Sequence, residues 1–517
     1  MGMPLLSLIV FTPLLAALML LFVPREQVHA LRRGAFVFSL VPLGLSLFLL
    51  HEFDATRGDL QWVERSAWIP QFGIHYAVGV DGISLFLVVL TAFLMPIVFL
   101  QAWDVEKRIK EYLVLMFIME TGMLGALVAT DLFLFYVFWE LMLVPMYFLV
   151  GIWGGERRVY AAVKLVLYTM AGSLLMLVAI IYLALAHQQQ IGQYSFAWEH
   201  LLQLSLPVET QRLLFAAFAL AFAIKVPMFP LHTWLPDAHT EAPTGGSVIL
   251  AAILLKMGTY GFLRFAIPLF PQVAVEAMPV IAALAVVGIV YGALVCMVQP
   301  DLKRLVAYSS VSHLGFVMLG MAALNLQGVQ GSLYQMLNHG LSTGGLFLAV
   351  GAIYERRHTR LIAEFGGLWA RIPVFAALFL VVMLSSVGLP GLNGFVGEFL
   401  ILLGAFGRYP VAAAVATTGV ILGAVYLLWM YQRVVFGPLT NPKNAELRDL
   451  SAREVAMFVP LVVLFFVMGL YPKPLLERME PATRVVLERV GPYVQRAAST
   501  SPCDTDAVRI AARGEHP

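Results

Sequence analysis

A lysine and two prolines interrupt an apolar run in Ala221-Phe-Ala-Ile-Lys225-Val-Pro227-Met-Phe-Pro230. Proline removes a backbone hydrogen bond and breaks a helix. Within a membrane, the carbonyl groups that a break leaves unpaired must be buried in protein or face a water-filled cavity. The pattern therefore predicts a broken membrane helix whose lysine reaches water or polar groups inside the protein.

A second stretch has the same character, Ser385-Ser-Val-Gly388-Leu-Pro390-Gly391-Leu-Asn-Gly394-Phe-Val-Gly397-Glu398. Glycines and a proline precede a glutamate there, so we expect a second broken helix with one ionisable residue. Two such helices in corresponding positions are typical of a transporter built from inverted repeats. They are the seventh and twelfth expected spans, and a separation of five spans gives the two units opposite topology.

The composition indicates a membrane protein. Of 517 residues, 60% are hydrophobic and 12% are charged, whereas soluble proteins carry about 25% charged residues. This argues against a soluble enzyme, a disordered protein and a nucleic-acid-binding protein, and a net charge of +2 indicates no acidic partner. Cys296 and Cys503 are too few for a disulfide framework or a metal–thiolate cluster. The sequence contains no nucleotide-binding loop, catalytic triad or metal-ligand spacing.

The apolar runs set the expected fold, since a helix needs about 20 residues to cross a bilayer. We expect an all-α integral membrane protein with about 14 transmembrane helices, two inverted five-helix repeats (spans 4–8 and 9–13) and discontinuous helices 7 and 12. The loops after odd-numbered spans carry most lysines and arginines, which places them in the cytoplasm and both termini on the opposite side. The runs begin near Pro4, Ala30, Asp81, Tyr112, Asp131, Tyr160, Thr210, Thr244, Val273, Leu302, Val329, Pro373, Pro410 and Glu454.

These spans divide the chain into five expected parts. The parts are residues 1–111 with helices 1–3, 112–267 with the first five-helix unit, 268–436 with the second, inverted unit, 437–474 with helix 14, and the tail 475–517. In the tail, mixed charges and apolar residues at helical spacing predict a surface helix from Leu475 to Arg496. Disorder is expected from Ala497 to Pro517.

Ionisable residues inside apolar runs are the functional candidates. Each costs about 2.5–3.5 kcal/mol at the bilayer centre, and such residues often mark an ion path. Histidine titrates closest to neutral pH, which suits a relay, although a structural role or haem ligation stays open. Glu120 suits function and structure equally, and Lys164 is close enough to the membrane edge to reach water along its apolar stem. The candidates are Glu120, Glu140, Lys225, Lys256, His313, His339 and Glu398.

The segment after the first break resembles a family signature. It reads Pro230-Leu-His-Thr-Trp-Leu-Pro-Asp-Ala-His-Thr-Glu-Ala-Pro-Thr-Gly-Gly-Ser247, followed by Leu254-Leu-Lys-Met-Gly258. It is similar to the antiporter-like, proton-translocating subunits of respiratory complex I, the NADH–quinone oxidoreductase, and the resemblance extends from about Thr130 to Arg433. Within the family, the M-type (chain 4) subunits are most similar. That likeness rests on Phe138-Trp-Glu-Leu-Met-Leu-Val-Pro-Met-Tyr-Phe148, on Leu337-Asn-His-Gly-Leu-Ser-Thr-Gly-Gly345 with Tyr354-Glu-Arg-Arg-His-Thr-Arg360, and on Glu398, where the L and N types are expected to have lysine.

The resemblance implies a function, namely that protons cross the membrane in this chain while other subunits transfer electrons from NADH to quinone. The implied roles are a first half-channel pair for Glu140 and Lys225, a central relay for Lys256, a continued polar axis for His313 and His339, and the exit for Glu398. No cofactor is expected in this chain, because FMN, iron–sulfur clusters and quinone belong to other subunits. The implied partners are L-type and N-type membrane-arm neighbours and the lipid bilayer, not nucleic acid. The implied location is a bacterial inner membrane, with both termini periplasmic.

Three other functions stay open at this point. A subunit of a multi-subunit sodium/proton antiporter is one, and a subunit of a proton-translocating membrane hydrogenase is another. A single-chain secondary transporter belongs to a different class, but nothing in the sequence resembles a substrate cavity. Glu398 and the loop from Glu355 to Arg360 favour the complex I type over the sodium/proton antiporter.

Overall fold

Helices dominate residues 3–499, the part of the chain that this computed structural model describes. The elements up to the middle of the chain are α1 (Leu5–Phe22), α2 (Val28–Glu52), β1 (Gln61–Ile69), β2 (Ile74–Val80), α3 (Leu85–Gln101), α4 (Ile109–Val128), α5 (Leu132–Leu141), α6 (Leu143–Trp153), α7 (Arg158–Ile191), α8 (Trp198–Leu201), α9 (Val208–Lys225), α10 (Trp234–Glu241), α11 (Thr244–Ile249), η3 (Leu250–Leu254), α12 (Leu255–Gly261), η4 (Phe262–Ala266) and α13 (Ile267–Leu269). Those that follow are α14 (Pro271–Met297), α15 (Leu302–Ala322), α16 (Leu326–Arg357), α17 (Pro373–Val387), α18 (Asn393–Phe406), α19 (Pro410–Val435), α20 (Pro442–Ala445), α21 (Ala452–Leu470) and α22 (Lys473–Ser499).

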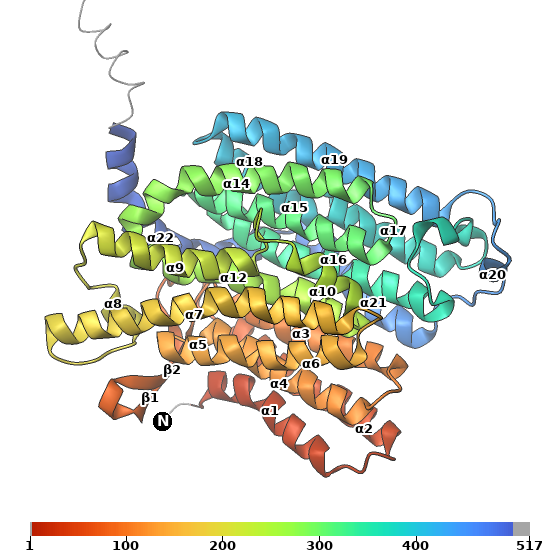
Figure 1. The fold of residues 1–517 in the computed structure, drawn as a ribbon, viewed down its shortest axis with the longest axis horizontal. Helices are drawn as coiled ribbons and strands as arrows, with labels where there is room; N and C mark the ends of the chain where they lie inside the picture. The colour runs from red at the N-terminus through yellow and green to blue at the C-terminus, as the bar shows by residue number, and fades with distance from the viewer. Residues whose placement is uncertain (1–2, 500–517) are drawn as a thin grey trace, which may run out of the picture.

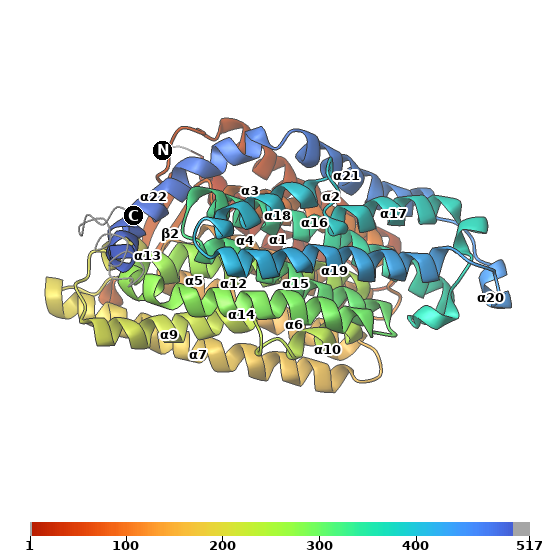
Figure 2. The same cartoon turned by 90° about the horizontal axis from the view of Figure 1, so that it is seen from above.

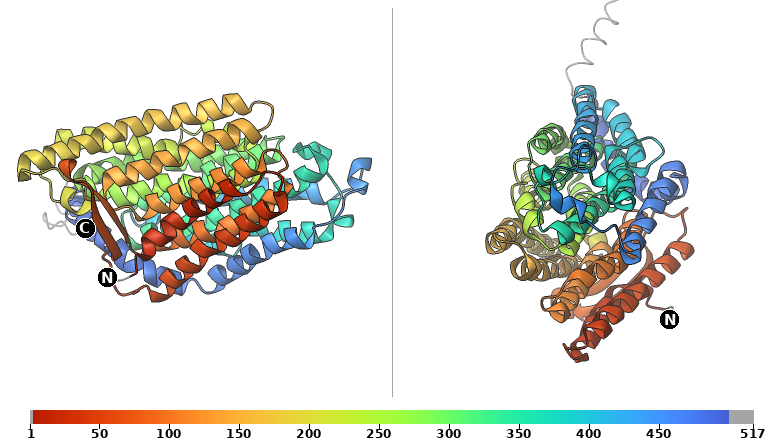
Figure 3. Two further views of the ribbon diagram at one scale, coloured as in Figure 1. Left: turned by 90° about the horizontal axis from the view of Figure 1, so that it is seen from below. Right: turned by 90° about the vertical axis from the view of Figure 1, so that its right-hand side faces the viewer.

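The long helices run side by side and form an elongated bundle (Figure 1). The N-terminus, the β-hairpin and α8 lie at one end, and α20 lies at the other (Figure 1). Seen from above, α22 lies obliquely along the top of the bundle, opposite α7 and α9 (Figure 2). A view along the helices places α1 and α2 at the edge of the bundle (Figure 3). The helices α9, α12, α15, α16 and α18 carry the buried residues Lys225, Lys256, His313, His339 and Glu398.

Within residues 3–499, twelve helical stretches are long and apolar enough to cross a membrane, as expected of a multi-pass membrane protein. The seventh and twelfth expected spans each consist of two helices separated by a break. The first break separates Lys225 at the end of α9 from Trp234 at the start of α10. The second separates Val387 at the end of α17 from Asn393 at the start of α18. Both breaks lie where the sequence predicted them, whereas the total of fourteen crossings stays a prediction.

Proline and glycine account for these breaks. Pro227 and Pro230 supply no N–H group, so α9 does not continue past the lysine. At the second break, Gly388 has a φ of 81°, which glycine adopts without strain, and it ends α17 as a left-handed cap. A Cβ atom at this position would lie 3.0 Å from Oε2 of Glu398. The missing side chain thus lets the glutamate lie against the backbone of the break.

The span that carries Lys256 is continuous but irregular. It runs from Thr244 to Leu269, and the π-helical segments η3 and η4 lie on either side of α12. π-Helical turns are rare and occur frequently at functional sites. Every side chain in this span is largely buried, so the irregularity belongs to the protein interior.

Two features were not expected from the sequence. A β-hairpin, with Gln61 opposite Val80 and Ile69 opposite Ile74, fills the connection before α3. The fifth expected span is divided at Met142 into α5 and α6, because Pro145 has no N–H to offer the carbonyl one turn earlier.

The tail helix extends slightly further than predicted. It was expected to end at Arg496 but continues to Ser499, so the disorder predicted from Ala497 was wrong for its first three residues. The remainder of that prediction, and Cys503, lie outside the described residues. Arg489 holds α22 in place, since its guanidinium donates to the carbonyl oxygens of Pro268 (2.6 Å) and Leu202.

A buried ion pair joins the irregular span to α3. Arg264 in η4 donates to Asp81, which lies just before α3, and the guanidinium lies 5.3 Å from the ring centroid of Trp198. Both side chains of the pair are about 95% buried, with exposed fractions of 6% and 5%. Removing one member of such a pair leaves a buried charge without compensation.

The substitution Asp81→Leu is therefore expected to lower the free energy of unfolding by about 3–5 kcal/mol. The double variant Asp81→Leu/Arg264→Met should recover most of this loss, because neither charge stays buried alone. The melting temperature of the purified protein measures both effects. Equal melting temperatures for the single variant and the wild type would contradict the stabilising role of the pair.

Candidate functional site

Glu140 and Lys225 lie in the same region but do not form an ion pair. Lys225 ends α9 and is 2% exposed, and its Nζ lies 5.3 Å from the ring centroid of Trp139. Its charge interacts with that of Glu140, yet no contact within 4.0 Å joins the two in the part of the chain that the structure describes. Oε1 of Glu140 is buried and has no hydrogen-bond partner there. The two groups are thus close enough for their charges to interact, without a direct hydrogen bond or ion pair between them.

Lys256 directly contacts one of the predicted histidines. The side chain is fully buried, and its Nζ lies 2.6 Å from the carbonyl oxygen of Ala251 and 2.5 Å from Nδ1 of His339. Ala251 belongs to the π-helical segment η3, so the irregular backbone supplies the acceptor. The carbonyl oxygen can only accept, whereas Nδ1 of the imidazole can accept or donate depending on its tautomer.

A second contact joins the other predicted histidine to the glutamate of the second break. Nδ1 of His313 lies 3.0 Å from Oε1 of Glu398, which also accepts a hydrogen bond of 3.1 Å from Nε2 of Gln335. Both charged partners are largely buried, with side chains 8% and 6% exposed. The glutamate is therefore fixed by two donors from α15 and α16.

The two contacts meet at the pair of histidines. The ring centroids of His313 and His339 lie 5.7 Å apart. Nε2 of each ring is buried and has no hydrogen-bond partner within residues 3–499. Lys256, His339, His313 and Glu398 thus form a series that crosses from α12 through α16 and α15 to α18, with direct contacts at both ends and a gap between the two imidazole rings.

Further titratable residues lie outside this series. Lys164, which the sequence places close enough to the membrane edge to reach water along its apolar stem, forms a 2.7 Å ion pair with Asp237 of α10. His239 is completely buried on the same short helix, stacks on Phe347 with centroids 4.5 Å apart, and has no partner for either ring nitrogen within the described chain. Its signal was present in the quoted signature segment, where it was not considered as a titratable group.

Lys303 is the other residue that sequence reasoning did not select, because it was counted as a loop charge. It is 3% exposed, and its Nζ donates to the carbonyl oxygen of Ala242 at 2.7 Å, at the end of α10. Arg360 donates to the carbonyl oxygen of Thr240 in the last turn of that helix. Cations at a helix C-terminus satisfy its unpaired carbonyls and oppose its dipole, so these residues stabilise the short helix after the first break.

Glu120 stands apart from all of these groups. It is fully buried in α4, and neither carboxylate oxygen has a hydrogen-bond partner in the described chain. The structure therefore does not join Glu120 to the series. No cluster of three or more histidine, cysteine, aspartate or glutamate side chains that could hold a metal ion occurs among residues 3–499.

The arrangement can move protons between fixed side chains, since imidazole accepts a proton on one nitrogen and releases one from the other. The glutamate at one end accepts from the nearest ring, and the lysine at the other end donates to the second ring.

Comparisons with known proteins agree on one family. The family model described as NADH:quinone oxidoreductase/Mrp antiporter matches residues 129–423. The chain is 48% identical to NADH-quinone oxidoreductase subunit M of Rhodobacter capsulatus over 99% of each protein. A chain of respiratory complex I from Thermus thermophilus, solved with bound NADH, is 35% identical with a TM-score of 0.85, covering 94% of this chain and 99% of that one. A chain of the Mrp complex from Dietzia has a TM-score of 0.81 at 22% identity over 95% and 99% of the two chains, and so shares the fold.

An amide network holds the second break against α16. Nδ2 of Asn338 donates to Oε1 of Gln335 (3.0 Å) and to the carbonyl oxygen of Asn393 (2.8 Å). The substitution Asn338→Leu leaves both buried acceptors unpaired, at about 1–3 kcal/mol each. We expect a lower melting temperature, and a control, Gln299→Leu, which removes one local hydrogen bond at a helix end, should change it little. Equal effects of the two substitutions would show that the network does not stabilise the break.

Proposed function

The chain belongs to the NADH:quinone oxidoreductase/Mrp antiporter family, and from this premise we propose that protons cross it along Glu140, Lys225, Lys256, His339, His313 and Glu398. Its full-length relatives are subunits of NADH-quinone oxidoreductase, so the chain is a membrane subunit of that proton-translocating enzyme. Electron transfer takes place in other subunits of the complex. The two histidine contacts, Lys256 with His339 and His313 with Glu398, carry the proposal.

The first half of the path begins with the pair that the structure holds apart. When the carboxylate of Glu140 approaches, the protonated form of Lys225 is favoured, because an opposite charge stabilises the ammonium ion. When the carboxylate withdraws, the lysine is left buried against Trp139 and loses its proton to the interior. Electron transfer elsewhere in the complex drives this change by a movement along the membrane arm.

The second half is a relay through both imidazoles. Lys256 donates to Nδ1 of His339, which then carries its own hydrogen on Nε2. A proton accepted at Nδ1 releases the one on Nε2 toward Nε2 of His313. That ring in turn passes the hydrogen on its Nδ1 to Glu398, from which the proton leaves the protein. The charge thus crosses two rings without any side chain having to travel.

His239 fits between the two halves. It interacts electrostatically with Lys256, Lys303 and His339, and both of its ring nitrogens are unpartnered within the described chain. The side chain lies on the short helix directly after the first break. It is therefore suitably placed to accept a proton on the way to the central lysine.

The wider setting follows from the same premise. The two inverted units are residues 112–267 and 268–436, after helices 1–3 in residues 1–111, with helix 14 in 437–474 and the tail in 475–517. FMN, iron–sulfur clusters and quinone are bound by other subunits, and this chain carries none of them. Its neighbours are L-type and N-type membrane-arm subunits and lipid. The membrane is the inner membrane of a bacterium, and both termini are periplasmic.

The substitution Glu140→Gln tests the first half of the path. It removes the charge that controls the lysine but keeps the side-chain shape. In membrane vesicles, NADH-driven proton uptake and NADH–quinone turnover should both fall to about a tenth or less, within the range for loss of a proton-transfer group, while the complex stays assembled.

The matched control for that experiment is Lys443→Ala, an exposed charge outside the path, which should leave both rates unchanged. If NADH-linked rates were normal in Glu140→Gln while sodium/proton exchange was lost, the sodium/proton antiporter function would replace this proposal. Intact pumping in Lys225→Ala would likewise contradict the scheme.

The substitution His313→Leu tests the relay, because it removes the imidazole that contacts Glu398. Proton uptake should fall by about tenfold or more, with normal amounts of assembled complex. Ser312→Ala, which removes a single hydrogen bond from the adjacent residue to the carbonyl of Ile289, should behave like the wild type. Wild-type pumping by His313→Leu would exclude a path through this histidine.

A further inference from the structure

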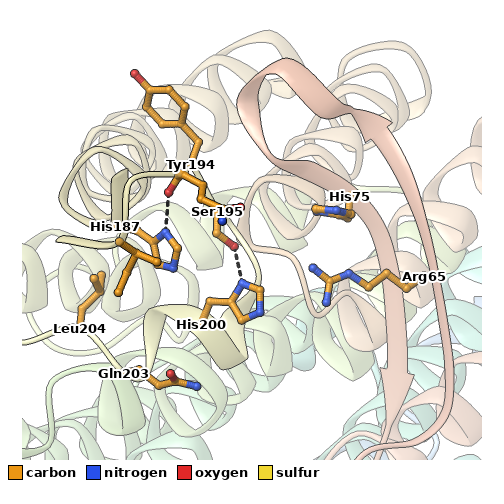
Figure 4. A pocket seen from close by; sticks show the side chains of 10 residues that line it. Arg65, His75, His187, Tyr194, Ser195, His200, Gln203 and Leu204 are labelled. Carbon is orange, nitrogen blue, oxygen red and sulfur yellow. Dashed lines mark hydrogen bonds between the residues drawn. The ribbon is translucent and has the colours of Figure 1, made fainter. Parts of the chain in front are cut away.

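A cavity of 340 Å³ lies at the end of the bundle that carries the N-terminus, between the β-hairpin and the connection from α7 to α9. Its size is within the range of about 300–1,000 Å³ that is usual for ligand sites. Its wall includes one arginine and three histidines, and Figure 4 shows them on facing elements: Arg65 of β1, His75 of β2, His187 of α7 and His200 of α8. We call this cavity the histidine pocket.

No acidic side chain lines the histidine pocket. On the hairpin side, the carboxylate oxygens of Asp131 accept the backbone N–H groups of His75, Phe133 and Leu134. Glu199 is exposed next to His200 but does not form part of the wall. Arg65 has no hydrogen-bond or ion-pair partner in the described chain. The pocket therefore has an uncompensated positive charge.

In each of the three imidazoles the protein occupies Nδ1 and leaves Nε2 without a partner in the described chain. Nδ1 of His187 lies 2.7 Å from the carbonyl oxygen of Gln193, Nδ1 of His200 lies 2.8 Å from Oγ of Ser195, and Nδ1 of His75 lies 3.1 Å from the carbonyl oxygen of Gly73. His187 is 93% buried as a whole residue, and its side chain forms part of the cavity wall.

These bonds decide what the Nε2 atoms offer. A carbonyl oxygen only accepts, so the neutral rings of His75 and His187 carry their hydrogen on Nδ1 and present a bare Nε2. Protonation adds an N–H donor at Nε2 of each ring. The wall then offers several N–H donors together with the guanidinium of Arg65, the arrangement that binds an oxyanion.

The groups around His200 also set the pH range of this change. Burial lowers the pKa of His200, and the charges of Arg65, His187 and His75 lower it further, against a smaller opposing effect of Glu199. The ring therefore stays neutral at neutral pH and gains its proton only in a more acidic range. A bound anion opposes this lowering of the pKa of His200, so anion binding and protonation of His200 favour each other.

The rim of the pocket is apolar and lies at the end of a membrane-spanning helix. Ile191, the last residue of α7, is 61% exposed, and Tyr194 is 38% exposed. Tyrosine at this level of a membrane protein is typical of the headgroup region. The pocket is thus accessible to an anion from the lipid headgroups as well as from solution.

We propose that the histidine pocket binds a phosphate-bearing anion, either the headgroup of an anionic phospholipid or free phosphate, and that it does so more tightly as the pH falls. This function is independent of the proton path. Linkage predicts that affinity rises by up to about tenfold per pH unit for each proton taken up on binding. Charge-assisted hydrogen bonds from Arg65 and His200 would hold the phosphate oxygens.

The test uses the purified intact complex with wild-type chain, Arg65→Gln or His200→Gln. Arg57→Gln is the matched control, because Arg57 lies close to β1 and is exposed, but is already paired with Asp59. One arm measures binding of radiolabelled inorganic phosphate by equilibrium dialysis at pH 6 and pH 8. The other reconstitutes the complex into vesicles of phosphatidylcholine with one fifth phosphatidylglycerol and measures the lipids it retains by mass spectrometry.

Phosphate binding that is stronger at pH 6, is kept by Arg57→Gln, and falls at least tenfold in Arg65→Gln and His200→Gln would support the proposal with free phosphate as the ligand. Retention of phosphatidylglycerol over phosphatidylcholine, lost in the same two variants, would support it with a lipid headgroup as the ligand. If the two variants matched the wild type in both arms, or if the wild type bound phosphate but did so equally at pH 6 and pH 8, the proposal would be overturned. NADH–quinone turnover, measured in the same samples, verifies assembly and keeps this result separate from any failure of the proton path.

Discussion

Backbone N–H and C=O groups that lose their helical hydrogen bonds inside this bundle need other hydrogen-bond partners within the protein, because hydrocarbon offers none. The chain meets this demand with lysine and arginine side chains. Lys256 donates to a carbonyl of the π-helical segment η3, Lys303 donates to the carbonyl at the end of α10, and Arg360 donates to the last turn of the same helix. Broken or irregular helices and buried basic side chains therefore occur together, because these side chains donate to backbone carbonyl oxygens at the irregular positions.

The two halves of the chain solve the same problem differently. In the first, the acid and the lysine are held apart, with Trp139 beside the lysine and no hydrogen bond at Oε1 of Glu140 within the described residues. In the second, the acid of the break is held by His313 and Gln335. A pair that is held apart, such as Glu140 and Lys225, suits control by an outside signal, whereas a pair in contact, such as His313 and Glu398, suits passive conduction. The proposed direction of transfer agrees with this difference in geometry.

The sequence predicted the helical membrane fold, both breaks and the buried position of Lys225, Lys256 and Glu398, because prolines, glycines and isolated charges act locally. It could not predict the ion pair of Lys164 with Asp237, since the two lie far apart in the chain and only tertiary packing brings them together. The β-hairpin was missed because its residues follow an apolar span and precede another, where a plain loop was expected. Pro145 indicates the division between α5 and α6 in the sequence, but the fifth span was predicted as one helix. The roles of the site residues stay a prediction.

In the proposed relay, the tautomers of the two imidazoles differ before and after a proton has passed. Each ring receives a hydrogen on one nitrogen and loses one from the other, so a single passage leaves both rings in the opposite tautomer. A second proton finds its acceptor atoms already occupied until the rings have rotated or the hydrogens have returned. The pair of His339 and His313 thus passes one proton and must return to its first tautomers before it passes another. This opposes a continuous leak of protons through the membrane.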